Sequence, residues 1–143
     1  TGQKAGEPRR IFQDQAIMSS TLAFSTPSEM PAASFERPVD LVHLARQTLG
    51  DRALEREVLG LFQVQARAIF AQLQAVTQMQ ARHDLAHTLK GSARAVGAWQ
   101  VAEAASFCET LGDDASGWQN GLVQLQRCID VALAAIEQIN RAN

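Results

Sequence analysis

Apolar residues recur every three or four positions through four long segments after Pro38, and this periodicity constrains the fold most strongly. In the last segment, from about 118 to 139, the apolar side chains fall within about 40° of one another on a helix. They are Trp118, Leu122, Leu125, Ile129, Ala132 and Ile136. Four prolines, no tyrosine and 46% hydrophobic residues favour helices over strands. The expected fold class is all-α.

Short turns between the periodic segments favour antiparallel packing of neighbouring helices. We expect a short first helix between Asp40 and Gly50, and a long second helix from Asp51 to about 76. The stripe of this second helix includes Leu54 and Leu61. Three further helices are expected at about 82–96, 98–111 and 118–139. The predicted architecture is an up-down-up-down four-helix bundle with a short N-terminal capping helix.

Residues 1–37 differ from the rest of the chain. Proline, glycine, serine and threonine are frequent there, and no apolar period lasts more than two turns. We interpret residues 1–37 as a mobile or weakly ordered N-terminal extension, with an ordered arm over an apolar patch as the alternative. Residues 38–143 form the predicted helical bundle.

Charge and composition exclude several functional classes. A net charge of −2 and a pI near 5.9 argue against nucleic-acid binding through bulk electrostatics. No apolar run approaches the roughly 20 residues that span a bilayer, and no secretory signal is evident, so we expect a cytoplasmic protein. Cys108 and Cys128 fall within predicted helices, where buried thiols are expected rather than a disulfide.

The third predicted helix carries polar residues opposite its apolar stripe. The stripe consists of Leu85, Leu89, Ser92 and Val96. The opposite side consists of His87, Lys90, Gly91 and Arg94. The imidazole should therefore face solvent, with a cation at i+3 and no side chain at i+4. Such a histidine suits the acceptance of a large anionic group, for example a phosphoryl group.

These residues resemble the histidine-containing phosphotransfer (HPt) family. The resemblance rests on His87-Thr88-Leu89-Lys90-Gly91-Ser92, the later Gly97-Ala98 pair and Cys108-Glu109. Upstream, Val39-Asp40-Leu41, Gly50-Asp51 and Phe62 look like the first two helices of that family. The resemblance covers residues 38–141.

The resemblance implies a phosphorelay carrier in two-component signalling. His87 would accept a phosphoryl group on Nε2 and exchange it with the aspartate of a response-regulator receiver domain or with a sensor histidine kinase. The chain has no Gly-rich phosphate loop, so we expect no ATP site, no enzyme activity in the usual sense and no cofactor of its own. The Mg²⁺ of the reaction would belong to the receiver domain. We expect a monomer that binds neither nucleic acid nor membrane.

The resemblance also suggests roles for the neighbours of His87. Lys90 would offset phosphoryl charge, and Gly91 would allow the close approach of a partner. Ser92 completes the motif, while Arg94 stands where many relatives have a small polar residue and would affect partner choice.

Two glutamines of the second helix, Gln65 and Gln72, lie on the same side as its apolar stripe. Each is either a polar residue at the edge of a broad stripe or an amide donor beside the phosphoryl site. A hairpin turn near 79–82 would set residues in the low seventies opposite His87, which makes Gln72 the better-placed donor.

Two other functional classes remain open. His83 and His87 have the i, i+4 spacing of a zinc-protease helix, although Asp84 stands where that motif has its glutamate. A metal-binding bundle that uses His83 and His87 is therefore one alternative, with a third ligand from His43 or a carboxylate. A non-catalytic helical adaptor is the other.

Overall fold

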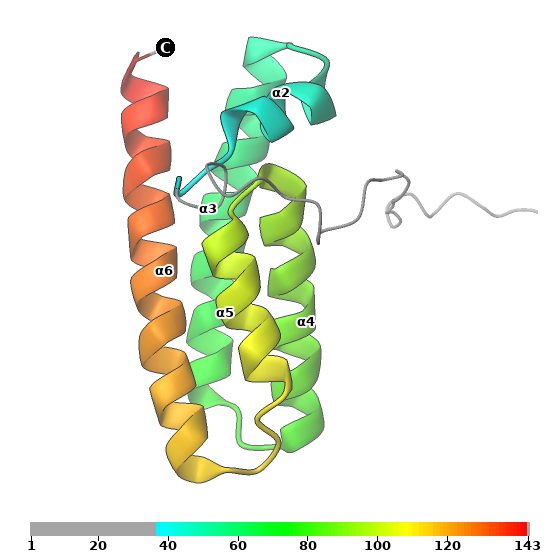
Figure 1. Cartoon of the computed structure of the whole chain (residues 1–143), viewed down its shortest axis with the longest axis vertical. Helices are drawn as coiled ribbons and strands as arrows, with labels where there is room; N and C mark the ends of the chain where they lie inside the picture. Colours follow the sequence, from blue (N-terminus) through cyan, green and yellow to red (C-terminus); the bar gives the residue numbers. More distant parts are fainter. Residues whose placement is uncertain (1–36, 143) are drawn as a thin grey trace, which may run out of the picture. The chain divides into compact units, whose positions relative to one another are not determined.

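The computed structural model describes residues 37–142, and all the regular elements in this range are helices. With the labels of Figure 1 they are α2 (Leu41–Thr48), α3 (Arg52–Ala75), α4 (Met79–Val96), α5 (Trp99–Glu109) and α6 (Ala115–Ala142). The predicted all-α class is confirmed. The extension predicted for residues 1–37 lies, apart from Arg37, outside the described residues.

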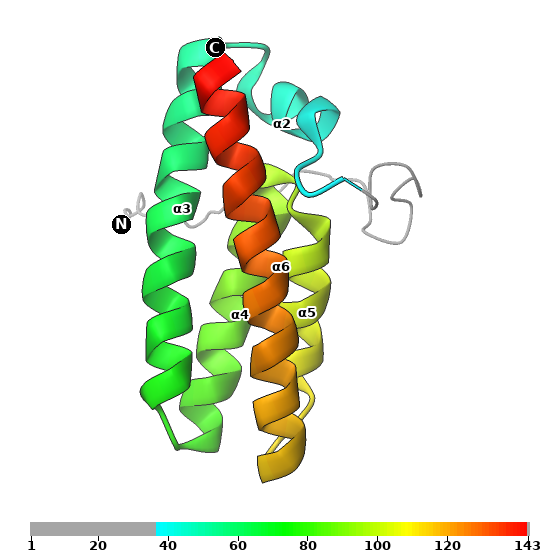
Figure 2. The ribbon, with the colours of Figure 1, turned by 90° about the vertical axis from the view of Figure 1, so that its left-hand side faces the viewer.

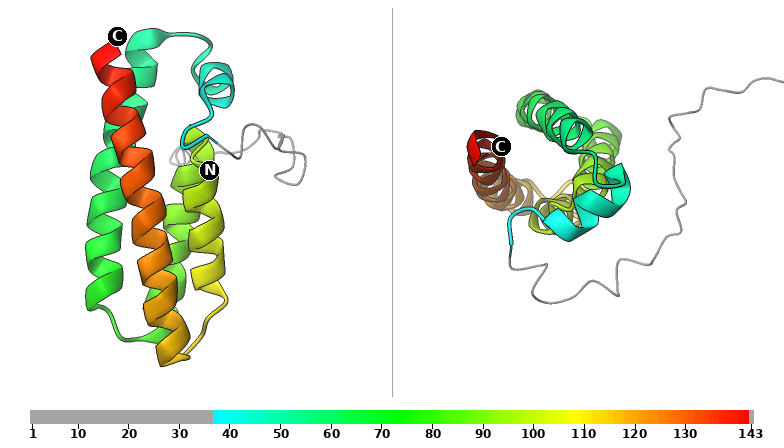
Figure 3. Two further views of the ribbon diagram at one scale, coloured as in Figure 1. Left: turned by 60° about the vertical axis from the view of Figure 1, so that its left-hand side comes forward. Right: turned by 90° about the horizontal axis from the view of Figure 1, so that it is seen from above.

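Helices α3, α4, α5 and α6 enclose a common core. Helix α4 packs against α3 and α5, and α6 packs against α5 and α3, so that each helix has two neighbours. Figures 1 and 2 show that consecutive long helices run in opposite directions, and the view from above in Figure 3 shows them around one axis. Helix α2 packs against α3 and α4 at one end. None of the described helices combines the length and apolar content needed to cross a bilayer.

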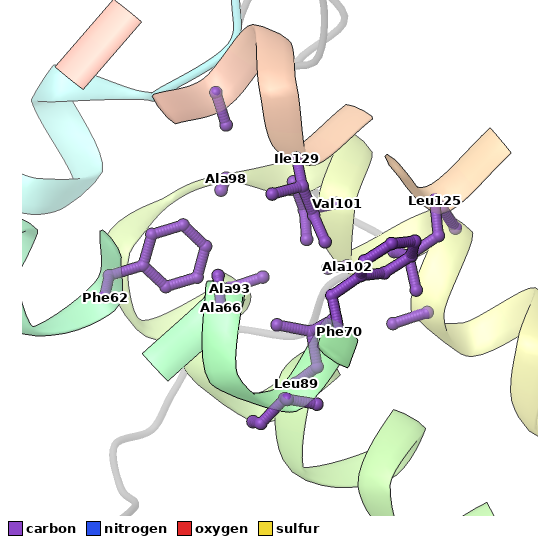
Figure 4. Close-up of a cluster of buried hydrophobic side chains, with 14 of the residues drawn as sticks. Phe62, Ala66, Phe70, Leu89, Ala93, Ala98, Val101, Ala102, Leu125 and Ile129 are labelled. Atoms are coloured by element: carbon purple, nitrogen blue, oxygen red, sulfur yellow. The ribbon is translucent and has the colours of Figure 1, made fainter. Parts of the chain in front are cut away.

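The core combines mostly small side chains from α5 with mostly large ones from α3 and α6, and α4 contributes both kinds (Figure 4). Ala93 of α4 and Ala102 of α5 are buried, and small residues allow these two helices to make the most extensive contact of the bundle. Phe62, Phe70 and Trp118 fill the remaining space. Both cysteines are free thiols, as expected, but only Cys108 is buried, while Cys128 is half-buried.

A set of contacts fixes the end of α4 against the start of α2, and we call Asp40, His43, Gly97 and Trp99 the joint region. Asp40 caps α2 by accepting a hydrogen bond from the backbone N–H of His43 (3.1 Å), which confirms the predicted cap. Its second carboxylate oxygen accepts from Trp99 Nε1 (3.0 Å), and its backbone N–H donates to Gly97 O (2.9 Å). Asp40 thus joins three helices through one residue.

Gly97 is required at this joint for two reasons. It ends α4 in the left-handed conformation with φ +82°, which side chains disfavour. A Cβ atom at this position would also lie 2.9 Å from Asp40 O. The Gly97-Ala98 pair of the sequence motif therefore has a structural explanation.

Some details of the predicted stripes are wrong. On α3, Leu54 and Leu61 are 40% and 64% exposed, and Leu59, Ala66 and Phe70 occupy the core instead. On α4, Ala93 rather than Ser92 completes the buried stripe, since Ser92 lies at its edge beside α3.

The hairpin between α3 and α4 also differs from the prediction. It spans residues 76–78 rather than 79–82, so α4 begins at Met79, before the predicted start at 82. Helix α4 is therefore longer than predicted. Helix α6 is also longer than predicted, since it begins at Ala115 rather than at 118.

Candidate functional site

The middle of α4 presents His87 to solvent on the side that adjoins α5. Its side chain is 64% exposed, as the predicted helix face required. Its Nδ1 atom lies 2.6 Å from Oε2 of Glu109, the last residue of α5. The two residues are far apart in sequence, and the contact between α4 and α5 brings them together.

The hydrogen bond to Glu109 fixes the tautomer of the neutral His87 ring. An ionised carboxylate can only accept hydrogen bonds, so Nδ1 must carry the proton. The lone pair of the neutral ring is then on Nε2, the nitrogen that the described residues leave without a hydrogen bond. The geometry therefore leaves Nε2 as the ring nitrogen with an available lone pair.

Glu109 is held between two basic side chains and is only 9% exposed. Its Oε1 atom lies 2.5 Å from Lys90 Nζ, while Oε2 contacts His87. Burial alone would raise the pKa of Glu109, but the hydrogen bonds and charges of Lys90 and His87 outweigh burial and lower this pKa below its ordinary value. The carboxylate is therefore ionised at neutral pH.

Glu109 is not among the site residues predicted from the sequence. Cys108-Glu109 entered only as part of the family resemblance. A carboxylate at the C-terminal end of a helix opposes the helix dipole, and burial adds to this penalty. That combination is a signal of a role other than stability, but its significance depends on the facing residues of α4.

Lys90 differs from the exposed cation that the sequence predicted. Its side chain is only 17% exposed, and its ammonium group bonds to Glu109. It lies on the same side of α4 as His87, so the expected neighbourhood is correct. Its direct contact, however, is with the carboxylate that orients the imidazole.

Gly91 stands in open space, one turn beyond His87. Apart from its two chain neighbours and the backbone of its own helix, no heavy atom lies within 4 Å of the position that a Cβ atom would occupy. Glycine inside a helix costs roughly 0.5–1 kcal/mol relative to alanine, and packing does not require it here. Gly91 therefore adds no side chain to the helix surface one turn beyond His87.

The other predicted site residues lie away from this cluster. Ser92 donates a hydrogen bond to Oε1 of Gln65 on α3 (2.7 Å), which fixes the α3–α4 register. Gln72 is exposed on α3, and the described hydrogen bonds do not connect it to His87. Arg94 is half-buried, two turns beyond His87 on α4.

A second imidazole lies one turn before the first. The rings of His83 and His87 are stacked, with centroids 6.1 Å apart and planes within 7°. His83 Nε2 is 3.8 Å from Glu109 Oε2. Within residues 37–142, His, Cys, Asp and Glu form no group of three that could hold a metal ion, so nothing observed favours the metal-binding alternative.

An exposed histidine whose tautomer is fixed by a nearly buried carboxylate, on the surface of a helical bundle, is an arrangement that could carry a group on an imidazole nitrogen. A family model described as the Hpt domain matches residues 57–141, more than half of the chain, and the chain belongs to this family. The resemblance seen in the sequence is thereby confirmed. Members of the family are phosphorelay carriers of two-component signalling that interact with response regulators and kinases, and they have no ATP site of their own. Neither the curated proteins nor the solved structures contain a match to this chain.

Proposed function

We propose that His87 is the phosphoacceptor of this carrier and that it exchanges the phosphoryl group with the aspartate of a receiver domain. The observation that supports this most directly is the 2.6 Å contact between His87 Nδ1 and Glu109 Oε2 on an exposed ring. It leaves the nucleophilic lone pair on Nε2, on the solvent-exposed side chain.

The transfer step follows from this arrangement. The Nε2 lone pair attacks the phosphorus of an aspartyl phosphate, a nitrogen–phosphorus bond forms, and the bond to the aspartate oxygen breaks with its electrons on the leaving carboxylate. No proton has to leave Nε2. The ring that results carries both the phosphoryl group and the Nδ1 proton, and the charge of Glu109 compensates the positive charge that develops on it.

The neighbouring residues support this step in different ways. Lys90 keeps Glu109 ionised and in place, and its charge also offsets that of the phosphoryl group. Gly91 lets the partner approach. Gln72 is a donor to the phosphoryl group once the partner is bound, Ser92 holds α3 beside α4, and Arg94 contributes to partner choice. The Mg²⁺ belongs to the receiver domain, and the carrier supplies no cofactor.

The outer surface of α3 supplies an apolar docking surface beside the acceptor. Leu61 and Val64 are 64% and 69% exposed, and Ala68 further along this side of the helix is also exposed. The hydrogen bond between Gln65 and Ser92 sets this surface beside the part of α4 that follows His87. A receiver that covers both would exclude water from the transfer. The carrier we propose is a cytoplasmic monomer, an antiparallel four-helix bundle capped by α2, which binds neither nucleic acid nor membrane.

A transfer assay tests the acceptor assignment. Receiver domains labelled with radioactive phosphate are incubated with wild type, His87→Gln and the control His43→Gln. We expect acid-labile, base-stable label on wild type and on the control, since this stability pattern is that of a phosphorus–nitrogen bond. His87→Gln should take up none. Label of this kind on His87→Gln would place the acceptor elsewhere, for example at His83.

A second pair of variants tests the docking surface. Val64→Glu introduces a charge into the apolar surface of α3 and should weaken receiver binding, which is measured as a higher receiver concentration for half-maximal transfer. Val123→Glu on α6 is the matched control, since Val123 is 57% exposed outside this surface. Equal behaviour of the two variants would argue against docking on α3.

A further inference from the structure

The ring of His83 lies between two carboxylates. Its Nδ1 atom is 3.5 Å from Asp84 Oδ1, and its Nε2 atom is 3.8 Å from Glu109 Oε2. The Asp84 oxygen also accepts a hydrogen bond from Gln80 Nε2 (2.9 Å), which holds it in place. Only an imidazolium carries protons on both nitrogens, so only the protonated ring can donate toward both carboxylates at once.

The two histidines share one oxygen atom. Oε2 of Glu109 is 2.6 Å from His87 Nδ1 and 3.8 Å from His83 Nε2, while Lys90 occupies Oε1. A movement of about 1 Å would bring His83 within hydrogen-bond distance of Oε2. A hydrogen bond from His83 to this oxygen would weaken the bond in which the same oxygen holds the Nδ1 proton of His87.

We propose that His83 is a positioning residue for the phosphoacceptor, which acts through the shared carboxylate of Glu109. This inference rests on the proposed function of His87 as acceptor. A neutral His83 leaves Glu109 to His87, and transfer proceeds at its full rate. A protonated His83 competes for Oε2 and places a positive charge one turn from the ring that has to become positive, so transfer slows.

The charged groups around His83 are consistent with this effect. On α4, Asp84 and the stacked His87 ring are its neighbours, and on α5 it faces Glu109, whose second oxygen is bonded to Lys90. Arg82, adjacent in sequence, has its guanidinium 4.5 Å from the centre of the Trp118 ring and so belongs to the core side of α4. A proton on His83 is therefore felt at His87 through one carboxylate and across the 6.1 Å between the ring centroids.

The first test needs no partner protein. The ¹⁵N chemical shifts of the His87 ring nitrogens are followed as a function of pH in the unphosphorylated wild type, His83→Gln and Thr88→Ala. Thr88 is an exposed neighbour of His87 that bonds to the backbone oxygen of Asp84 and serves as control. We expect two-step curves for wild type and the control, and a single step for His83→Gln, because two interacting groups release their protons in two steps that belong to the pair. Identical single-step curves for all three would overturn the inference.

The second test measures transfer from a phosphorylated receiver at about pH 8 and about pH 6, above and below the ordinary imidazole pKa of about 6.5. The phosphorylated receiver alone is measured at the same two pH values in parallel. Wild type and His83→Gln should match at the higher pH, and the variant should be about three- to tenfold faster at the lower pH, the effect of one charge roughly 6 Å away. Equal rates at both values would overturn the inference. A wild type that takes no label at all would instead refute the proposed function, and the shift curves would still decide whether His83 acts on His87.

Discussion

Two regions of the bundle each combine a histidine with an acidic residue, and they use the pair in opposite ways. In the joint region, Asp40 caps α2 and bonds to Trp99, while His43 packs edge-on against the Trp99 ring at 4.8 Å. In the acceptor cluster, which we define as His87, Lys90, Gly91 and Glu109, the carboxylate bonds directly to an imidazole that is 64% exposed. The first arrangement fastens helices together, and the second leaves Nε2 of an exposed ring available for the transfer that we propose.

The difference shows what decides the role of a histidine–carboxylate pair. The exposure of the imidazole and the group to which the carboxylate bonds matter more for that role than the residue types. Burial lowers the pKa of His43, although contacts with the backbone of Arg94 and Ala95 and the charge of Asp40 act in the opposite direction. The partner of His87, by contrast, is a carboxylate whose ionisation Lys90 secures. Each region also contains one glycine of α4 or its cap, and the two glycines serve different needs.

Among variants that keep the acceptor His87, the largest effect on transfer is expected at Gly91. Gly91→Leu places a side chain beside His87, where space is open, and should slow transfer about a hundredfold by keeping the partner's phosphorus out of position. The free energy of unfolding should stay the same or rise by up to about 1 kcal/mol, since leucine is the better helix former. Stopped-flow transfer and urea unfolding measure the two. Near-normal transfer by the folded variant would show that the glycine does not serve access.

Gly97→Ala should give the reverse pattern. The positive φ and the 2.9 Å approach to Asp40 O should lower the free energy of unfolding by about 2–3 kcal/mol. Transfer per folded molecule should hardly change, because the acceptor cluster lies more than a turn away on α4. A stable Gly97→Ala protein with impaired transfer would mean that the two regions are coupled.

The next effect concerns Lys90. Lys90→Ala leaves the nearly buried Glu109 without its cation, and transfer should fall roughly tenfold rather than vanish. Glu109→Gln removes the charge from the other side of the same contact. If Lys90 acts through Glu109, the double variant should transfer no more slowly than the slower of the two single variants. Additive losses would indicate that Lys90 acts on the phosphoryl group alone.

Most of the fold, and part of the site, could be predicted from the sequence. Periodicity identified the helices, and Asp40 and Gly97 marked their ends, because these signals are local. The prediction failed where a stripe was broad: Leu61 is apolar but points outward, and Ala93 was passed over in favour of Ser92.

The acceptor cluster could be predicted only as far as α4 supplies it. His87, Lys90 and Gly91 lie within five residues, so helix geometry relates them. Glu109 comes from α5, and it reaches His87 because α5 packs against α4. A contact of that kind depends on distances between helices in the folded core. The spacing of residues along the sequence does not determine these distances.

The smallest effect is a pH dependence of stability that comes from the joint region. The unfolded chain protonates His43 near the ordinary imidazole pKa of 6.5, and the folded protein does so only at lower pH because burial disfavours the charged ring. Below 6.5 the unfolded state therefore binds more protons, and stability falls until the pH passes the lowered pKa of the folded state. Above 6.5 the group contributes no pH dependence. Urea unfolding at about pH 7.5 and about pH 5.5 should show a smaller difference for His43→Gln than for wild type. His83→Gln is the control. It retains His43 and changes a half-exposed side chain, so it should keep the wild-type difference. If His43→Gln loses as much stability on acidification as wild type, the buried imidazole is not its source, and the contrast between the two histidine regions does not extend to protonation.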